Sequence, residues 1–131
     1  MRVIDSSVFV KYLSREKGFE HAAKLIEEGG VSFELALKET ANALWKKVIL
    51  KELPESVALE IVNDLASDPP FLLADQKKHL LEAFKIAVKH GLTVYDTLFI
   101  ALAQAENLEL VTADEKQFKV ALKEKVRAII V

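Results

Sequence analysis

The stretch LVTADEKQF (Leu110–Phe118) decides the fold, because a buried strand passes into a helix within it. The apolar residues end at Thr112, and Asp114 follows where the helical pattern of Glu115–Leu122 begins. Asp114 and Gln117 have the spacing of a helix cap, which is one explanation of the aspartate. The other explanation is a carboxylate at the mouth of a parallel sheet. The choice between these two explanations depends on the residues elsewhere in the chain.

Strands and helices alternate on both sides of this junction. Five segments are predicted to be strands: Arg2–Asp5, Val31–Phe33, Phe71–Asp75, Leu108–Thr112 and Val126–Val131. Helices are predicted at Phe19–Ile26, from Leu37, from Pro54, at Gln76–His90, from Val94 and at Glu115–Leu122. This alternation predicts an α/β fold, a three-layer α/β/α sandwich around a parallel sheet. At 131 residues, a single domain spanning 1–131 is expected.

Helical periodicity also predicts which side chains pack inside. The helix from Leu37 repeats apolar residues at helical spacing, which places Trp45 in the core. The helix from Pro54 is expected to bury Val57, Ile61 and Leu65. His90 ends its helix just before a glycine, where an imidazolium would offset the negative end of the helix dipole.

Composition indicates a folded chain of nearly balanced charge. Hydrophobic residues make up 51% and charged residues 29% of the sequence, as in ordinary globular domains. The absence of cysteine excludes disulfides, thiolate zinc sites and cysteine nucleophiles. The net charge of −2 argues against a strongly basic nucleic-acid binder. No apolar run has the roughly 18 residues of a membrane span and no leader precedes the first strand, so a cytoplasmic location is expected.

Four carboxylates fall near one edge of the predicted sheet. Asp5 ends the first strand, and Asp114 follows the fourth. Glu39 lies about one turn into the helix after the second strand, and Asp96 lies near the start of the helix from Val94. Ligands of open α/β sheets bind beyond the carboxyl ends of the strands, so these four are the candidate catalytic residues. Each also has a plain structural explanation, a helix cap for the aspartates and a solvent-facing position for Glu39.

Carboxylates that gather at one place need a counter-charge. Like charges a few ångströms apart cannot all stay ionised unless a cation joins them. Oxygen ligands, without cysteine or a close pair of histidines, favour Mg²⁺ or Mn²⁺ over zinc. Such ions bind phosphate groups and activate water. The pattern therefore favours metal-dependent phosphodiester hydrolysis, with Asp5, Glu39, Asp96 and Asp114 as the candidate metal ligands.

Polar residues beside the acids are candidates for supporting roles. Asn42 lies one turn beyond Glu39, and Lys46 one turn further, on the same helix face. Asn42 could hold a carboxylate or a metal-bound water, and Lys46 could contact a phosphate. The hydroxyls of Ser7 and Thr112 could bind a ligand water or a phosphate oxygen. A solvated helix face and helix capping are the corresponding structural explanations.

Four segments, taken together, resemble the PIN-domain ribonucleases, in particular the VapC-like toxins of toxin–antitoxin pairs. They are VIDSSVFV around Asp5, KETANAL around Glu39, YDTLFIALA around Asp96 and LVTADEKQF around Asp114, in the family's order and across essentially the whole chain. The resemblance implies a five-stranded parallel sheet in the order 3-2-1-4-5. It also implies that these four acids form a metal site with Asn42 and Thr112 in support.

The activity implied by the resemblance is Mg²⁺- or Mn²⁺-dependent cleavage of RNA by an activated water. A homodimer, and a small antitoxin protein that occludes the acidic groove, are implied as well. The chain has only three arginines, which leaves contacts to RNA to lysines such as Lys11, Lys46 and Lys116.

Two other classes of function stay open from the sequence. A phosphorelay receiver is also a small parallel α/β domain, and Asp75 at the end of the third strand could be its phosphoacceptor, with Thr112 as the switch hydroxyl. Against it, the first strand lacks an adjacent acidic pair. A PIN-like module without activity, which only binds a partner, is the second alternative, and the presence of all four acids argues against it.

Overall fold

Five parallel strands form the centre of the protein. The computed structural model describes all 131 residues, and its strands are ordered β3-β2-β1-β4-β5. The strands are β1 (Arg2–Ile4), β2 (Gly30–Ser32), β3 (Leu72–Leu73), β4 (Glu109–Thr112) and β5 (Ala128–Ile130). Every neighbouring pair is parallel. The predicted order is therefore confirmed, with β1 beside β4 at the topological switch point.

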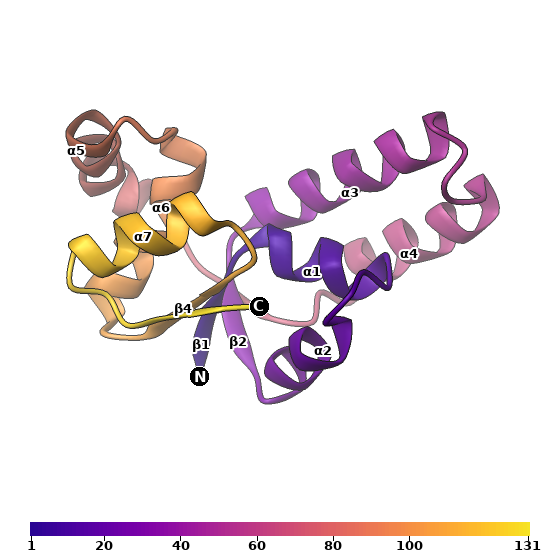
Figure 1. Ribbon diagram of the computed structural model, residues 1–131, viewed down its shortest axis with the longest axis horizontal. Coiled ribbons are helices and arrows are strands. Elements are labelled where there is room, and N and C mark those ends of the chain that lie inside the picture. The colour runs from indigo at the N-terminus through magenta and orange to yellow at the C-terminus, as the bar shows by residue number, and fades with distance from the viewer.

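Helices cover both faces of this sheet. They are α1 (Ser6–Leu13), α2 (Phe19–Glu27), α3 (Glu34–Ile49), α4 (Glu55–Ser67), α5 (Leu80–His90), α6 (Val94–Glu106) and α7 (Glu115–Lys123), with a 3₁₀ turn at Lys77–His79. Figure 1 shows α1–α4 on one side of the sheet and α5–α7 on the other. The three-layer sandwich is thus confirmed, and its two helix layers follow from right-handed connections in opposite directions along the sheet.

The helix α6 forms the middle of the core. Its residues Thr97 to Ala103 are all buried, as expected for a helix that is apolar on every side. The rings of Phe33 and Phe99 meet edge-on, with centroids 5.3 Å apart, and join α6 to the end of β2. No single helix is long and apolar enough to cross a membrane; Lys77–His90 and Val94–Glu106 reach that length only as a pair bent by 118°.

The α3–α4 hairpin corrects two of the predicted core positions. Figure 1 shows the hairpin projecting beyond the sheet, and no other element of the chain lies over its outer end. Trp45 is 59% exposed and Val57 is exposed as well, so placing them in the core was wrong. Leu65 is buried as predicted, while Ile61 is only half-buried. Helical spacing correctly identified an apolar face of the helix. The helix extends beyond the edge of the sheet, so the outer part of that face stays uncovered.

The third strand excludes the receiver alternative. Receiver-type sheets have the order 2-1-3-4-5, with the third strand in the centre. Here β3 is a two-residue strand at the sheet edge, with both of its leucines exposed. Asp75 follows it, exposed, and its Oδ1 accepts a hydrogen bond from Lys77 N at 3.1 Å. Asp75 therefore lies away from the switch point that a phosphoacceptor would occupy.

His90, the last residue of α5, has a specific partner in the fold. Its Nε2 lies 2.6 Å from Glu124 Oε2 at the end of α7, and both side chains are largely buried. Lys89 Nζ lies 3.3 Å from the same oxygen. His90 lowers the pKa of the Glu124 carboxyl below its ordinary value of 4.5, with Lys89 acting in the same direction. The pair links the ends of two helices in one layer.

The pH dependence of stability tests this link. A carboxyl whose folded-state pKa is lowered contributes stability above its unfolded pKa and loses it as pH falls. Glu124→Gln should therefore lower the free energy of unfolding by about 1 kcal/mol at pH 7, and the difference from wild type should vanish well below pH 4.5. Urea unfolding at several pH values measures this. Glu82→Gln, in an exposed pair with Lys85, is the control and should change little; an equal loss from Glu124→Gln at low and neutral pH contradicts the assignment.

Candidate active site

Asp5 is the buried centre of the site. It follows β1, caps α1, and is 3% exposed. Its Oδ2 accepts hydrogen bonds from Ser7 N at 3.0 Å and Ser7 Oγ at 2.5 Å, while Oδ1 accepts one from Gln117 Nε2 at 3.2 Å. Burial raises the pKa of Asp5, these hydrogen bonds oppose the rise, and the charge of Asp114 adds to it. The cap and the site-facing position thus belong to the same carboxylate.

Asp96 approaches Asp5 from the first turn of α6. Thr93 caps this helix, accepting from Asp96 N at 3.3 Å and donating to Asp96 Oδ2 at 3.1 Å, so Asp96 is held by the cap and is not the cap itself. Burial raises the pKa of Asp96, and the charges of Asp5 and Asp114 raise it further. The most deeply buried helix of the core therefore positions this acid, with its α-helical start anchored by Thr93.

Glu39 comes from α3, on the opposite side of the sheet from α6. Its Oε1 accepts a hydrogen bond from Ser6 Oγ at 3.0 Å, which ties α3 to the first residue of α1. Burial raises the pKa of Glu39, and the charges of Asp5 and Asp96 raise it further. Glu39 is half-buried rather than fully solvated. Its carboxylate therefore shares one electrostatic environment with two of the other acids.

Asp114 caps α7, as its sequence pattern predicts. Its Oδ1 accepts a hydrogen bond from Gln117 N at 3.0 Å, and its own N–H donates to Thr112 Oγ1 at 3.0 Å. Its charge still acts on both Asp5 and Asp96. Asp114 therefore combines the two explanations of the opening stretch, because it caps a helix and adds charge to the site.

Gln117 is the residue that the sequence pattern assigned only to a cap. Its side chain is fully buried, and its Nε2 donates to Asp5 Oδ1 and, at 2.9 Å, to the carbonyl oxygen of Asp96. Its Oε1 accepts from Thr112 Oγ1 at 2.5 Å. A signal was available, since Gln117 occupies the same helix face as the buried Val120 and Ala121. A polar side chain on that face needs a buried partner.

The two predicted hydroxyls lie inside the same network. Ser7 Oγ accepts from Ala113 N at 2.9 Å and lies 3.3 Å from Thr112 Oγ1. These contacts bridge the end of β1 to the end of β4. Thr112 is fully buried, and Ser7 is half-buried. Both therefore hold the acid-bearing strands together. Ser7 is partly accessible to a ligand, but the Thr112 hydroxyl is inaccessible as the protein stands and binds Gln117 and Asp114 N instead.

The donor set suits a hard cation. All four charged groups are carboxylates, and three of them have raised pKa values because burial and neighbouring negative charge disfavour their ionised forms. No three acidic or histidine side chains lie close enough, as they stand, to hold one ion together. Mg²⁺ is often bound by only one or two carboxylates together with water, so this spacing does not conflict with it. The residues fit such an ion in type and in charge.

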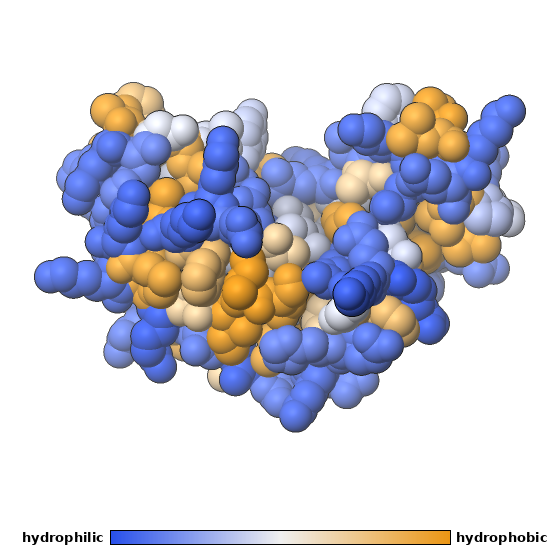
Figure 2. Space-filling model, in the orientation of Figure 1, coloured by the Kyte–Doolittle hydropathy of each residue, from blue (hydrophilic) through white to orange (hydrophobic).

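An open groove runs from Glu39 along α3. Its volume is about 520 Å³, and it is lined by Leu35, Lys38, Glu39, Asn42, Ala43, Lys46 and Tyr95. The predicted neighbours Asn42 and Lys46 are thus brought together with Glu39, and both are exposed. Figure 2 shows the hollow on this side of the molecule, between the α3–α4 hairpin and helices α5–α7. A polymer could lie in such a groove beside the acids.

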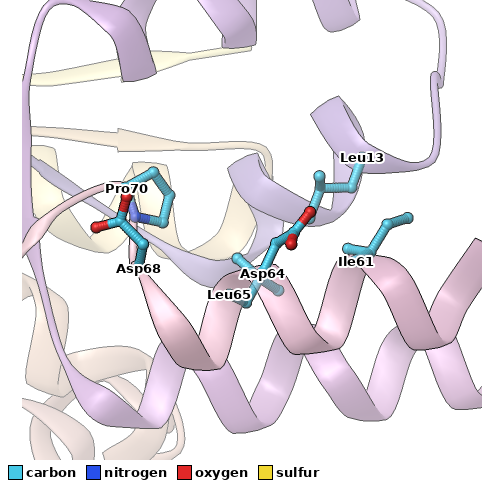
Figure 3. A pocket seen from close by; sticks show the side chains of 6 residues that line it. All are labelled: Leu13, Ile61, Asp64, Leu65, Asp68 and Pro70. Atoms are coloured by element: carbon cyan, nitrogen blue, oxygen red, sulfur yellow. The ribbon is translucent and has the colours of Figure 1, made fainter.

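A second hollow lies elsewhere, between α1 and α4. It is lined by Leu13, Ile61, Asp64, Leu65, Asp68 and Pro70 (Figure 3) and has a volume of about 200 Å³. Figure 3 shows the carboxylates of Asp64 and Asp68 apart from each other, one beside Leu13 and one beside Pro70. None of the four predicted acids lines this hollow. Its aspartates therefore provide controls for substitutions of the four predicted acids.

The sequence of the chain matches that of a known domain family over most of its length. The description of that family is "PIN domain", and the match covers residues 2–123. The chain belongs to the PIN domain family. The predicted resemblance is thereby confirmed, and the acidic residues described above lie within the matched part of this PIN domain.

Two curated relatives of this PIN domain come from Pyrobaculum aerophilum. Ribonuclease VapC3 is 31% identical over 117 residues, which cover 87% of this chain and 89% of VapC3. Exonuclease VapC9 is 28% identical over 117 residues, which cover 85% of this chain and 77% of VapC9. Both matches span most of this chain.

Solved structures of other proteins have the same fold as this chain. The crystal structure of PAE2754 from Pyrobaculum aerophilum has a TM-score of 0.72 and 26% identity, and the match covers 91% of this chain and 83% of that one. VapBC2 from Rickettsia felis, bound to a promoter DNA fragment, has a TM-score of 0.65 and 16% identity, covering 99% and 98%. At that identity, the second match supports the PIN fold alone.

Proposed function

We propose that this single PIN domain, residues 1–131, is a metal-dependent endoribonuclease and the toxin of a toxin–antitoxin pair. The observation that carries the proposal is the convergence of Asp5, Glu39 and Asp96, whose charges act on one another, with Asp114 beside them. A buried group of like charges is costly unless a cation neutralises it. The acids lie at the carboxyl ends of β1 and β4, and open α/β sheets bind their ligands at this edge.

In this proposal, each acid has a role. Asp5 and Asp96 would hold Mg²⁺ or Mn²⁺, and Asp114 and Glu39 would act on it through bound water. When bound, such an ion supplies positive charge that activates water and neutralises the phosphate. Gln117 orients the Asp5 carboxylate through its hydrogen bond, and Thr93 orients that of Asp96.

The residues on the groove side would bind the substrate. Lys46 contacts a phosphate of the RNA, and Asn42 holds a carboxylate or a water molecule next to Glu39. The open groove favours cleavage within a strand, because a chain can enter and leave it on either side of the acids. A relative is named an exonuclease, so the position of cleavage needs a direct test.

Cleavage of a circular single-stranded RNA tests the site and the position together. Wild-type protein should cut the circle in Mg²⁺ or Mn²⁺ and not in EDTA, because a circle offers no end to an exonuclease. Asp5→Asn and Asp96→Asn should each lower the rate by more than about 100-fold, since even outer partners of a metal ligand contribute 10–100-fold. The matched control is Asp64→Asn, in the hollow between α1 and α4, which should cut as wild type does. Full activity in both site variants refutes the assignment.

Metal binding has a readout that does not depend on cleavage. Ligands that bind only the folded state raise the melting temperature, so Mg²⁺ should raise that of the wild type. Asp5→Asn should weaken this response. It should also raise the melting temperature in EDTA, because burial and Asp114 raise the pKa of Asp5 and make its ionised form costly at neutral pH. An identical response to Mg²⁺ in the two proteins would count against a shared site.

Protein partners are part of the proposal. Two apolar surfaces are exposed on either side of the hollow in Figure 2. One follows α5, where Leu81, Phe84 and Val88 are 57–70% exposed; the other lies on the α3–α4 hairpin around Trp45 and Leu59. Patches of this kind mark protein interfaces. We assign a second copy of the chain to α5, whose stripe can meet itself about a two-fold axis, and a small antitoxin to the hairpin, in the cytoplasm.

The two surfaces can be tested separately. Purified wild-type protein should sediment as a dimer and Phe84→Lys as a monomer, because a buried charge in an apolar seam is costly. Trp45→Lys should remain dimeric, but should lose copurification with the coexpressed product of the neighbouring open reading frame. That product should also relieve the growth arrest caused by the wild type. A dimer that persists in Phe84→Lys contradicts the use of α5.

A further inference from the structure

One large side chain in the groove has no role in the proposed metal site. Tyr95 lies directly before Asp96 in the first turn of α6 and is 61% exposed. The aromatic pairs of the protein join Phe9 to Phe71 and Phe33 to His79 and Phe99, so the Tyr95 ring has no stacking partner. Its hydroxyl takes part in no hydrogen bond with another side chain. A rigid aromatic face is thus presented to solvent within one residue of a candidate metal ligand.

Two unpaired lysines face the same groove. Lys38, Asn42 and Lys46 follow one another at i, i+4 and i+8, which is one face of α3. The two lysines are anchored about 12 Å apart along the helix axis. Neither forms a salt bridge, although the chain carries an excess of acidic residues. Their charges are free for an anionic ligand that lies along the groove.

A groove lined by an aromatic face, two free cations and an acid is suited to single-stranded nucleic acid. Proteins that bind single strands combine a positively lined groove with aromatic rings on which bases stack. Every base has a π-face, but a paired base inside a helix has both faces covered by its neighbours. A ring such as Tyr95 can therefore stack fully only on an unpaired base.

We propose that Tyr95 stacks on an unpaired base next to the cleaved phosphate, while Lys38 and Lys46 contact flanking phosphates. This proposal rests on the nuclease function proposed above and assigns to Tyr95 the contact with one base of the bound strand. Tyr95 is then a substrate-binding residue, and the rigid α6 sets its distance from Asp96. The stacked base determines which phosphate is placed next to the acids.

Equilibrium binding in EDTA tests the proposal without cleavage. The probe is a fluorescein-labelled 12-nucleotide single-stranded RNA, together with a series in which one nucleotide at a time is abasic. Tyr95→Ala should weaken binding of the intact RNA by about 5- to 150-fold, the range for one stacked base, and Tyr95→Phe should bind within about twofold of wild type. Wild-type protein should bind the RNA with one particular abasic position more weakly by a similar factor. Tyr95→Ala should bind that abasic RNA as tightly as it binds the intact RNA. Lys38→Ala should lower the dependence of log K on log salt by about 0.7.

Tyr12→Ala is the matched control, because Tyr12 is the only other tyrosine and lies beside Leu53 and Val57, away from the groove. It should bind RNA as wild type does. Unchanged RNA affinity of Tyr95→Ala overturns the proposal. If the sedimentation of this variant changes as well, the ring belongs to a contact between copies of the chain. If RNA binds through Tyr95 but is never cut, the nuclease function fails and the binding site stands. If Tyr95→Ala cuts RNA as well as wild type does, the nuclease function stands and the proposed role of Tyr95 fails.

Discussion

A carboxylate buried at the end of β1 constrains the rest of the structure. Asp5 is almost inaccessible to water, and its ionised form is disfavoured both by burial and by the charge of Asp114. Such a group needs hydrogen-bond donors or a cation. The fold supplies donors from two distant segments, Ser7 at the start of α1 and Gln117 on α7. The remaining acids approach the same point, so neutral donors alone leave the negative charge uncompensated.

The order of the strands explains why the acids can meet. Because β1 and β4 are neighbours, the chain leaves the sheet at adjacent positions toward α1 and toward α7, which lie in opposite layers. Asp96 is held by α6, which is buried on every side, and Glu39 by α3 in the other layer. The rigid centre thus carries Asp5, Asp96 and Asp114, and the flank formed by α3 carries Glu39. The open groove along α3 is the consequence, because nothing in the chain closes over that flank.

Much of this could be predicted because local patterns agree with the global fold. The strands, the helix starts at Asp5, Thr93 and Asp114, and the three-layer arrangement follow from apolar periodicity and capping residues. Trp45 shows the limit of such patterns. Its spacing marks an apolar helix face, but whether that face is covered depends on the length of the sheet and on partner chains, and neither is encoded within the helix.

The sequence by itself determined the four acids and their order along the chain, with Asp5 and Asp114 at strand ends, Asp96 at a helix start and Glu39 within a helix, because these are local features. Only the tertiary structure decided what surrounds them. Gln117 has the sequence context of a cap, yet its side chain turns inward to Asp5 because that face of α7 packs on the sheet. Tyr95 and Lys46 are about fifty residues apart and share one groove. Proximity between distant segments is set by strand order and helix packing, and no local pattern contains it.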